Sequence, residues 1–94
     1  MAKFITRVEL YDAKKEDYEI LTEVMERTGF STKITGSNGI VYQLPAAEYL
    51  IEGKLLLTNV LIIVQNAAKA VKKEYGVIAS EITGATWEGL LVVK

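Results

Sequence analysis

The sequence has no cysteine and no histidine among its 94 residues. Without cysteine there is no disulfide framework, no thiolate nucleophile, no iron–sulfur cluster and no thiolate zinc site. Without histidine the Ser–His and Cys–His nucleophile pairs are missing, together with the usual imidazole metal ligand. Any chemistry must therefore come from carboxylate, lysine, arginine or tyrosine side chains, or the function is binding alone.

An excess of one charge is also lacking. Eleven Lys and Arg residues oppose twelve Asp and Glu residues, which gives a formal net charge of -1. A protein that clamps DNA normally carries a clear cationic excess, so this balance excludes a highly basic DNA clamp. Long hydrophobic runs are missing as well. The longest, 55–64, is interrupted by Thr58 and Asn59 and as a helix would span about half of a bilayer.

The start of the chain lacks the apolar segment of a secretory signal, because Lys3 and Arg7 lie within its only apolar stretch. We therefore predict a cytoplasmic protein without a membrane partner. A chain of this length is predicted to fold as one domain over residues 1–94, with enough buried surface for one modest core.

Hydrophobic periodicity predicts the order strand, helix, strand, strand, helix, strand, with one more strand at the end. The segment Gly36-Ser37-Asn38-Gly39 is typical of a hairpin turn. Pro45 cannot donate a hydrogen bond, so it is expected to interrupt the strand that follows this turn. The predicted strands are 4–11, 30–35, 40–44, 48–52, 77–82 and 87–93, and the predicted helices are 15–28 and 57–74.

This order predicts an α+β fold of the ferredoxin-like type, a split βαβ sandwich with two right-handed crossovers. The two helices would cover one face of an antiparallel sheet and leave the other face open. The core face of the first helix is predicted to contain Tyr18, Leu21, Val24, Met25 and Thr28. The core face of the second is predicted to contain Leu56, Leu57, Val60, Ile63, Val64, Ala67 and Val71.

The outer face of the first helix is acidic, because it carries Glu16, Glu19, Glu23 and Glu26. Charge runs of this kind usually form a solvated helix face. Such a face repels phosphate, so nucleic acid is not expected to dock on it.

Asp12 directly follows the first strand, and its role is open. Beside a two-fold axis, its carboxylate would hold Mg²⁺ together with its symmetry mate. Alternatively, it would accept backbone N–H bonds as the N-cap of the first helix or in an Asx turn. Arg7, on the open face of the first strand, would clamp a phosphate group or form an ion pair with Glu9.

Two further groups of side chains are candidates for binding. Aromatic side chains on strands would stack nucleic-acid bases, or simply belong to the strands and the core: Tyr42, Tyr49 and Trp87. The densest basic cluster would contact phosphate, or simply complement the dipole at the end of the second helix: Lys69, Lys72 and Lys73.

Leu61 and Ile62 lie off the predicted core face of the second helix. Apolar residues in such a position indicate an interface, either with a second copy of the chain or with another protein. We therefore predict a homodimer that is held together at least partly by these two residues.

Several segments are typical of one protein family: Thr6-Arg7-Val8-Glu9-Leu10, Asp17-Tyr18, Gly29-Phe30-Ser31, Gly76-Val77, Thr86-Trp87 and above all Tyr42-Gln43-Leu44-Pro45-Ala46-Ala47-Glu48-Tyr49. The chain resembles a family of short bacterial proteins that is grouped with GhoS, the antitoxin of type V toxin–antitoxin systems. The likeness extends over nearly the whole chain.

The resemblance implies a ferredoxin-like endoribonuclease that cleaves single-stranded RNA as a homodimer. It implies Asp12 as the catalytic and Mg²⁺-binding residue, because a similar small CRISPR-associated nuclease has an aspartate at the end of its first strand. Arg7 and Arg27 would then contact phosphate. The charge balance and the acidic helix favour the other hypothesis, a non-catalytic homodimeric module that binds a protein through its open sheet face or second helix.

Overall fold

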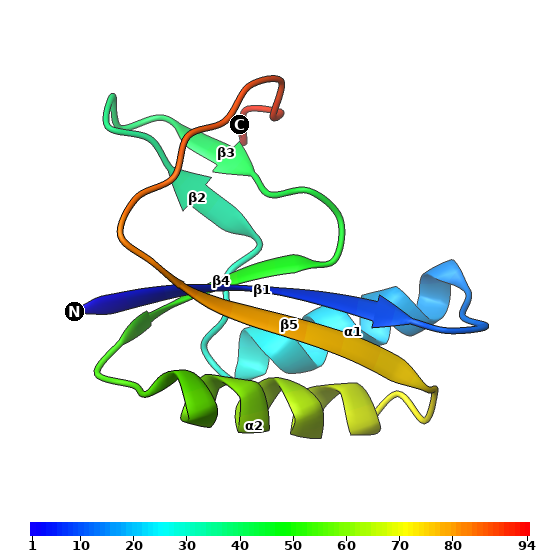
Figure 1. Ribbon diagram of the computed structural model, residues 1–94. Helices are drawn as coiled ribbons and strands as arrows, with labels where there is room; N and C mark the ends of the chain where they lie inside the picture. Colours follow the sequence, from blue (N-terminus) through cyan, green and yellow to red (C-terminus); the bar gives the residue numbers. More distant parts are fainter.

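The computed structural model describes residues 1–94 and has an α+β architecture (Figure 1). In chain order the elements are β1 (Ala2–Leu10), α1 (Lys15–Arg27), β2 (Lys33–Thr35), β3 (Val41–Gln43), β4 (Glu48–Gly53), α2 (Leu57–Lys69) and β5 (Tyr75–Ile82). The strands form two antiparallel sheets, a three-stranded one in the order β4-β1-β5 and a two-stranded one of β2 and β3. The predicted α+β class, with two helices and antiparallel sheets, is confirmed.

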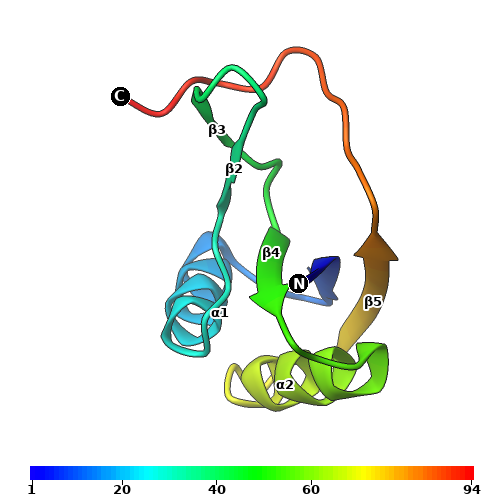
Figure 2. The same ribbon diagram turned by 90° about the vertical axis from the view of Figure 1, so that its left-hand side faces the viewer.

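Buried and exposed side chains alternate along β1, and this alternation shows which face of the main sheet is covered. Its buried side chains face α1 and α2, which lie together below the sheet (Figures 1 and 2): Phe4, Thr6, Val8 and Leu10. Arg7 and Glu9, between them, are exposed on the opposite face. The predicted open face of the sheet therefore exists.

The first helix follows its prediction except at Thr28, which is predicted on the core face but is the exposed C-cap residue. Leu21 and Met25 are fully buried, and Tyr18 and Val24 pack partly buried against the same core. The helix ends at Arg27, and Gly29 then adopts a left-handed backbone with a φ of 101°. A glycine in this conformation just after a helix is the usual way for the chain to leave it.

The second helix is shorter than predicted, because it ends at Lys69 and not at residue 74. Two tight turns follow, in which the N–H groups of Val71 and Lys72 donate to carbonyls three residues earlier, and Lys72 takes a φ of 63°. The chain thus reverses before β5 begins. Neither helix of the structure is long and apolar enough to cross a membrane.

The predicted extension of the α2 core face to Leu56 and Leu57 is wrong. These side chains are 69% and 42% exposed. Leu56 is the N-cap residue, with an extended backbone, so the helical periodicity does not apply to it. Leu57 lies almost one turn before Val60, the first buried residue of the helix.

The predicted hairpin is present, with Gly39 at a φ of 81° in the turn between β2 and β3. It stands away from the main sheet (Figure 2). The predicted strand 30–35 pairs with that sheet only through a bridge between Ser31 and Leu50, although the side chain of Phe30 is buried in the main core. The hairpin is separated from the main sheet at Pro45, where a turn lies between β3 and β4. The missing N–H of proline predicts such an interruption.

The predicted strand 87–93 is reduced to one bridge, between Tyr42 and Val92. The N–H of Gln43 donates to the carbonyl of Leu91 at 2.8 Å, and the N–H of Val93 donates to that of Val41 at 2.9 Å. The segment after β5 therefore crosses over to the hairpin (Figure 2) and does not add a strand to the main sheet.

Replacing Lys72 by glycine should stabilise the protein. A left-handed backbone costs a residue with a side chain about 1–2 kcal/mol, and the extra flexibility of glycine when unfolded offsets only part of this. We expect the free energy of unfolding in urea to rise by about 0.5–1 kcal/mol. Lys69→Gly, within α2, should instead lower it by a similar amount; equal effects of both variants would contradict the prediction.

Candidate functional site

Asp12 lies exposed in the turn between β1 and α1, with a left-handed backbone at a φ of 52°. It is not the N-cap of the helix. That position belongs to Lys14, whose N–H donates to Oδ2 of Asp17 at 2.8 Å. The N-cap alternative is therefore wrong, because the helix begins at Lys15, as predicted, three residues after Asp12.

The chain holds no group of three or more acidic side chains that are placed to bind a metal ion. A single exposed carboxylate is a poor fit to the oxygen-rich coordination of Mg²⁺. Asp12 on its own does not constitute a metal site, and a role for Mg²⁺ stays a prediction of the family resemblance.

The two candidate arginines lie apart from Asp12 and from each other. Arg7 is on the open face of β1, whereas Arg27 is in the last turn of α1 and forms an ion pair with Glu23. The predicted pair of Arg7 with Glu9 is not formed. The other ion pair joins Lys3 and Glu52 across β1 and β4.

The candidate aromatic side chains do not form one platform. Tyr49 is 1% exposed and belongs to the core. Tyr42 and Trp87 meet edge to face, with ring centroids 5.4 Å apart, and join the hairpin to the segment after β5. This contact gives Tyr42 and Trp87 a structural role.

The lysine cluster lies at the end of α2, with Lys69 in its last turn and Lys72 and Lys73 in the connection to β5. This is where the helix dipole favours positive charge. On the same helix Ile62 is 53% exposed and Leu61 is half-buried. Both predicted interface residues are thus within reach of a partner.

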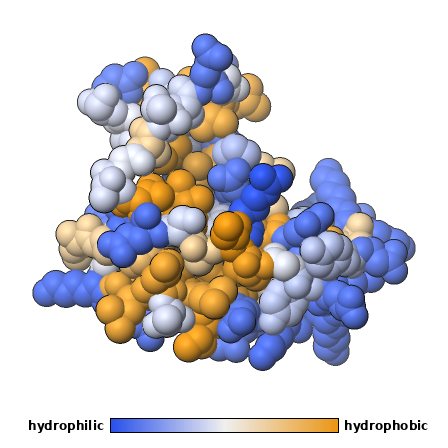
Figure 3. All heavy atoms as spheres, viewed as in Figure 1, coloured by the Kyte–Doolittle hydropathy of each residue, from blue (hydrophilic) through white to orange (hydrophobic).

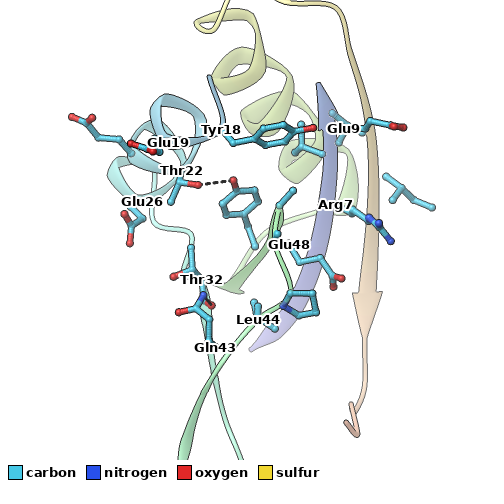
Figure 4. Close-up of a pocket in the computed structure, with 18 of the residues that line it drawn as sticks. Arg7, Glu9, Tyr18, Glu19, Thr22, Glu26, Thr32, Gln43, Leu44 and Glu48 are labelled. Atoms are coloured by element: carbon cyan, nitrogen blue, oxygen red, sulfur yellow. Dashed lines mark hydrogen bonds between the residues drawn. The ribbon is translucent and has the colours of Figure 1, made fainter. Parts of the chain in front are cut away.

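A cleft of about 960 Å³ runs from α1 around the start of β4 onto the open face of the main sheet. One wall is residues 43–49, which belong to the segment that carries most of the family resemblance. The opposite wall is α1, and the far end reaches Arg7, Glu9 and Ile78. The dashed line in Figure 4 joins Thr22 to the hydroxyl on the ring of Tyr49. Glu19 and Glu26 lie on one side of this ring, and Arg7 and Glu9 lie on the other.

Three sets of backbone contacts fix the wall of residues 43–49. The N–H of Glu48 donates to the carbonyl of Pro45 at 3.2 Å, which closes a turn around Ala47. The carbonyl of Ala47 then accepts the N–H of Val8 at 3.1 Å and ties the turn to β1. On the hairpin side, the carbonyl of Thr32 accepts the N–H of Leu44 at 2.8 Å.

Tyr18 joins α1 to the end of β1 beside the cleft. Its hydroxyl accepts the N–H of Leu10 at 2.9 Å and lies 3.3 Å from the carbonyl of the same residue. In the register of the sheet, β4 has no residue opposite Leu10. The tyrosine hydroxyl therefore replaces a strand partner for a backbone that would otherwise be unpaired.

Thr22 and Tyr49 form the polar contact at the centre of the cleft, with 2.8 Å between their hydroxyl oxygens (Figure 4, dashed line). Burial raises the pKa of Tyr49 above its usual 10.0, and the charge of nearby Glu26 adds to the rise. The hydrogen bond from Thr22 lowers this pKa and opposes part of the shift.

The charged residues that line the cleft are predominantly acidic. Five glutamates are set against two basic residues, Arg7 and Lys15: Glu9, Glu19, Glu23, Glu26 and Glu48. Apolar side chains lie between them, including Leu44, Pro45 and Ala46. In the sequence, the acidic helix face and the segment 42–49 are two separate features. Nothing in the sequence indicates that they form opposite walls of one cleft.

A comparison with models of known protein families, and one with curated protein sequences, found no match to this chain.

Tyr49→Phe should lower stability at neutral pH by about 0.5–1.5 kcal/mol, because Thr22 loses its partner. It should also change the response to alkali. The folded state holds the Tyr49 proton to higher pH than the unfolded chain does, so wild-type stability falls as the pH rises above 10.0. Urea unfolding between pH 8 and 11 should show that this fall is smaller in Tyr49→Phe and unchanged in Tyr11→Phe.

Proposed function

We propose that this chain is a non-catalytic protein-interaction module that binds a positively charged segment of a partner protein in the cleft over Tyr49. The observation that carries the proposal is a cleft of about 960 Å³ with five glutamates around an apolar surface. This volume lies in the usual range for ligand sites, and a cleft lined by one sign of charge concentrates ligands of the opposite sign.

Lysine and arginine side chains suit such a lining because each combines an apolar stem with a charged head. The stems would lie on Leu44, Pro45 and Ala46, and the heads would reach the glutamates of α1 or the open sheet face. A phosphate-rich ligand has the opposite charge requirement, and only Arg7 and Lys15 in the lining would attract it.

We also propose that the fold is a reduced ferredoxin-like sandwich. Ser31 bridges to Leu50 on the edge of β4 that faces away from β1, so that the order across the main sheet becomes β5, β1, β4 and Ser31. With α1 and α2 on one face, this is the order that two right-handed crossovers produce. The second strand of the ferredoxin-like fold would then be reduced to the bridge at Ser31. The hairpin of β2 and β3 would be an addition to that fold.

RNA cleavage, as in the GhoS family, is supported by the family resemblance alone. Asp12, Arg7 and Arg27 lie in a turn, on a sheet face and at a helix end, and only Arg7 lines the cleft. The purified protein should therefore leave a single-stranded RNA oligonucleotide intact, with or without Mg²⁺. Metal-dependent cleavage that is lost in Asp12→Asn would contradict our proposal and support the nuclease.

The cleft is tested by reversing charge on its α1 wall. Glu19→Lys/Glu26→Lys should weaken binding of a short labelled peptide of alternating lysine and leucine. Two lost ion pairs and the new repulsion amount to about 1–2 kcal/mol, which is about five- to thirtyfold in Kd. Fluorescence anisotropy measures this, and rising salt should weaken wild-type binding.

Glu16→Lys/Glu88→Lys is the matched control, because it changes the net charge equally at exposed residues outside the cleft. It should bind the peptide almost as the wild type does. A counterpart peptide with glutamate in place of lysine should not bind. Equal losses in both double variants would show attraction by overall charge only and would exclude the cleft as the site.

A further inference from the structure

The strand β5 has a free edge along its whole length. It is the outer strand in the order β4-β1-β5, and its eight residues contain no proline, no lysine and a single charge, Glu81. Proteins normally protect long edge strands with such residues or with bulges, to prevent pairing with other chains. The opposite edge of the sheet is partly closed, because Ser31 and Leu50 exchange hydrogen bonds of 2.7 and 2.8 Å.

The register shows which backbone groups of β5 point outward. The N–H of Tyr11 donates to the carbonyl of Glu74 at 2.8 Å, so position 74 faces β1. Because hydrogen-bonding direction alternates along an antiparallel strand, even-numbered residues of β5 face β1 and odd-numbered ones face outward. The outward-facing residues are Tyr75, Val77, Ala79 and Glu81.

The side of the molecule that carries this edge is also hydrophobic. Figure 3 shows hydrophobic side chains gathered over the middle of β5 and the first half of α2. Ile78 is 64% exposed, and Leu57 on α2 is 42% exposed. A right-handed crossover from β4 through α2 to β5 places the flank of α2 with Leu57 and Leu61 on the side of the free edge.

We infer that β5 pairs antiparallel with β5 of a second copy of the chain, about a two-fold axis beside Ile78. In this register Val77 lies opposite Ala79 of the partner, and Tyr75 lies opposite Glu81. Every outward-facing N–H and C=O group of the strand then has a partner. The exposed Ile78 side chains of the two copies become neighbours on the open face.

A second copy fits this edge better than an unrelated strand does. The register sets a larger side chain, Val77, against a smaller one, Ala79, and keeps the two Glu81 carboxylates about 20 Å apart along the strands. A stable interface needs about 800 Å² from each partner, more than one strand supplies. The same axis puts both α2 helices on one side of the joined sheet, where Leu57 and Leu61 of the two copies add apolar contact.

This assignment changes the predicted interface. It shares Ile78 with the far end of the cleft, but it is argued from the free edge of β5 and not from the ligand of the cleft. Leu61 remains in the interface, on the α2 flank beside β5. Ile62 points away from the core on the outer side of α2 and lies outside it. The main contact is β5. The sequence predicts a strand there but does not indicate that its outer edge is free.

A cysteine scan tests the register directly, because the natural chain has no cysteine. Under mild oxidation Ile78→Cys should form a disulfide-linked dimer, since the two thiols face each other across the axis at a non-hydrogen-bonded pair. Ser80→Cys is the matched control on the same face. Its two thiols would be about 14 Å apart and should cross-link far more slowly.

Light scattering of the unmodified protein should give twice the chain mass of 10.4 kDa. Ile78→Lys should raise the dissociation constant at least tenfold while circular dichroism stays unchanged, whereas Ile20→Lys, at another exposed isoleucine, should leave the dimer intact. A monomer mass at micromolar concentration, or equal cross-linking of Cys variants at 78 and 80, would overturn the inference.

Discussion

The structure depends on β1 being hydrogen-bonded along both of its edges. β4 pairs with it from Ala2 to Arg7, and β5 pairs with it from Lys3 to Leu10. Both helices pack on its buried side chains, so that each remaining part of the core is attached to this strand. Thr6, its only polar buried residue, donates to the carbonyl of Tyr49 at 3.4 Å and so connects the strand to the centre of the cleft.

Much of the fold was accessible from local patterns in the sequence. Alternation along β1, the spacing of Leu21 and Met25, and the glycines after α1 and in the hairpin each reflect a constraint within a few residues. Errors arose where distant partners decide the structure. Periodicity alone extended α2 to residue 74, but the reversal into β5 ends it at Lys69. The sequence predicts a strand over 30–35, yet only Ser31 pairs with the main sheet.

The site was less accessible than the fold, because its parts are remote from one another in the chain. The acidic face of α1 was visible as a charge pattern and residues 42–49 as a motif, but their meeting depends on the turn at Pro45 and on the bond from Val8 to Ala47. For Asp12, the local sequence left the structural role open. Its position after a strand suggested a metal ligand, a helix N-cap or an Asx turn, and the structure places it in a turn with a left-handed backbone, before the N-cap Lys14.

The central place of β1 has a consequence for how the chain is made. The ribosome releases β1 before both strands that pair with it, and β5 is completed only at residue 82. At ordinary rates of about 5–20 residues per second, the nascent strand waits roughly 4–15 s for its last partner. During that time the edge of β1 that β5 will occupy is open to chaperones and to neighbouring nascent chains. Folding of this small domain is therefore tied to the synthesis of β5, and truncation before β5 would leave its central strand half-paired.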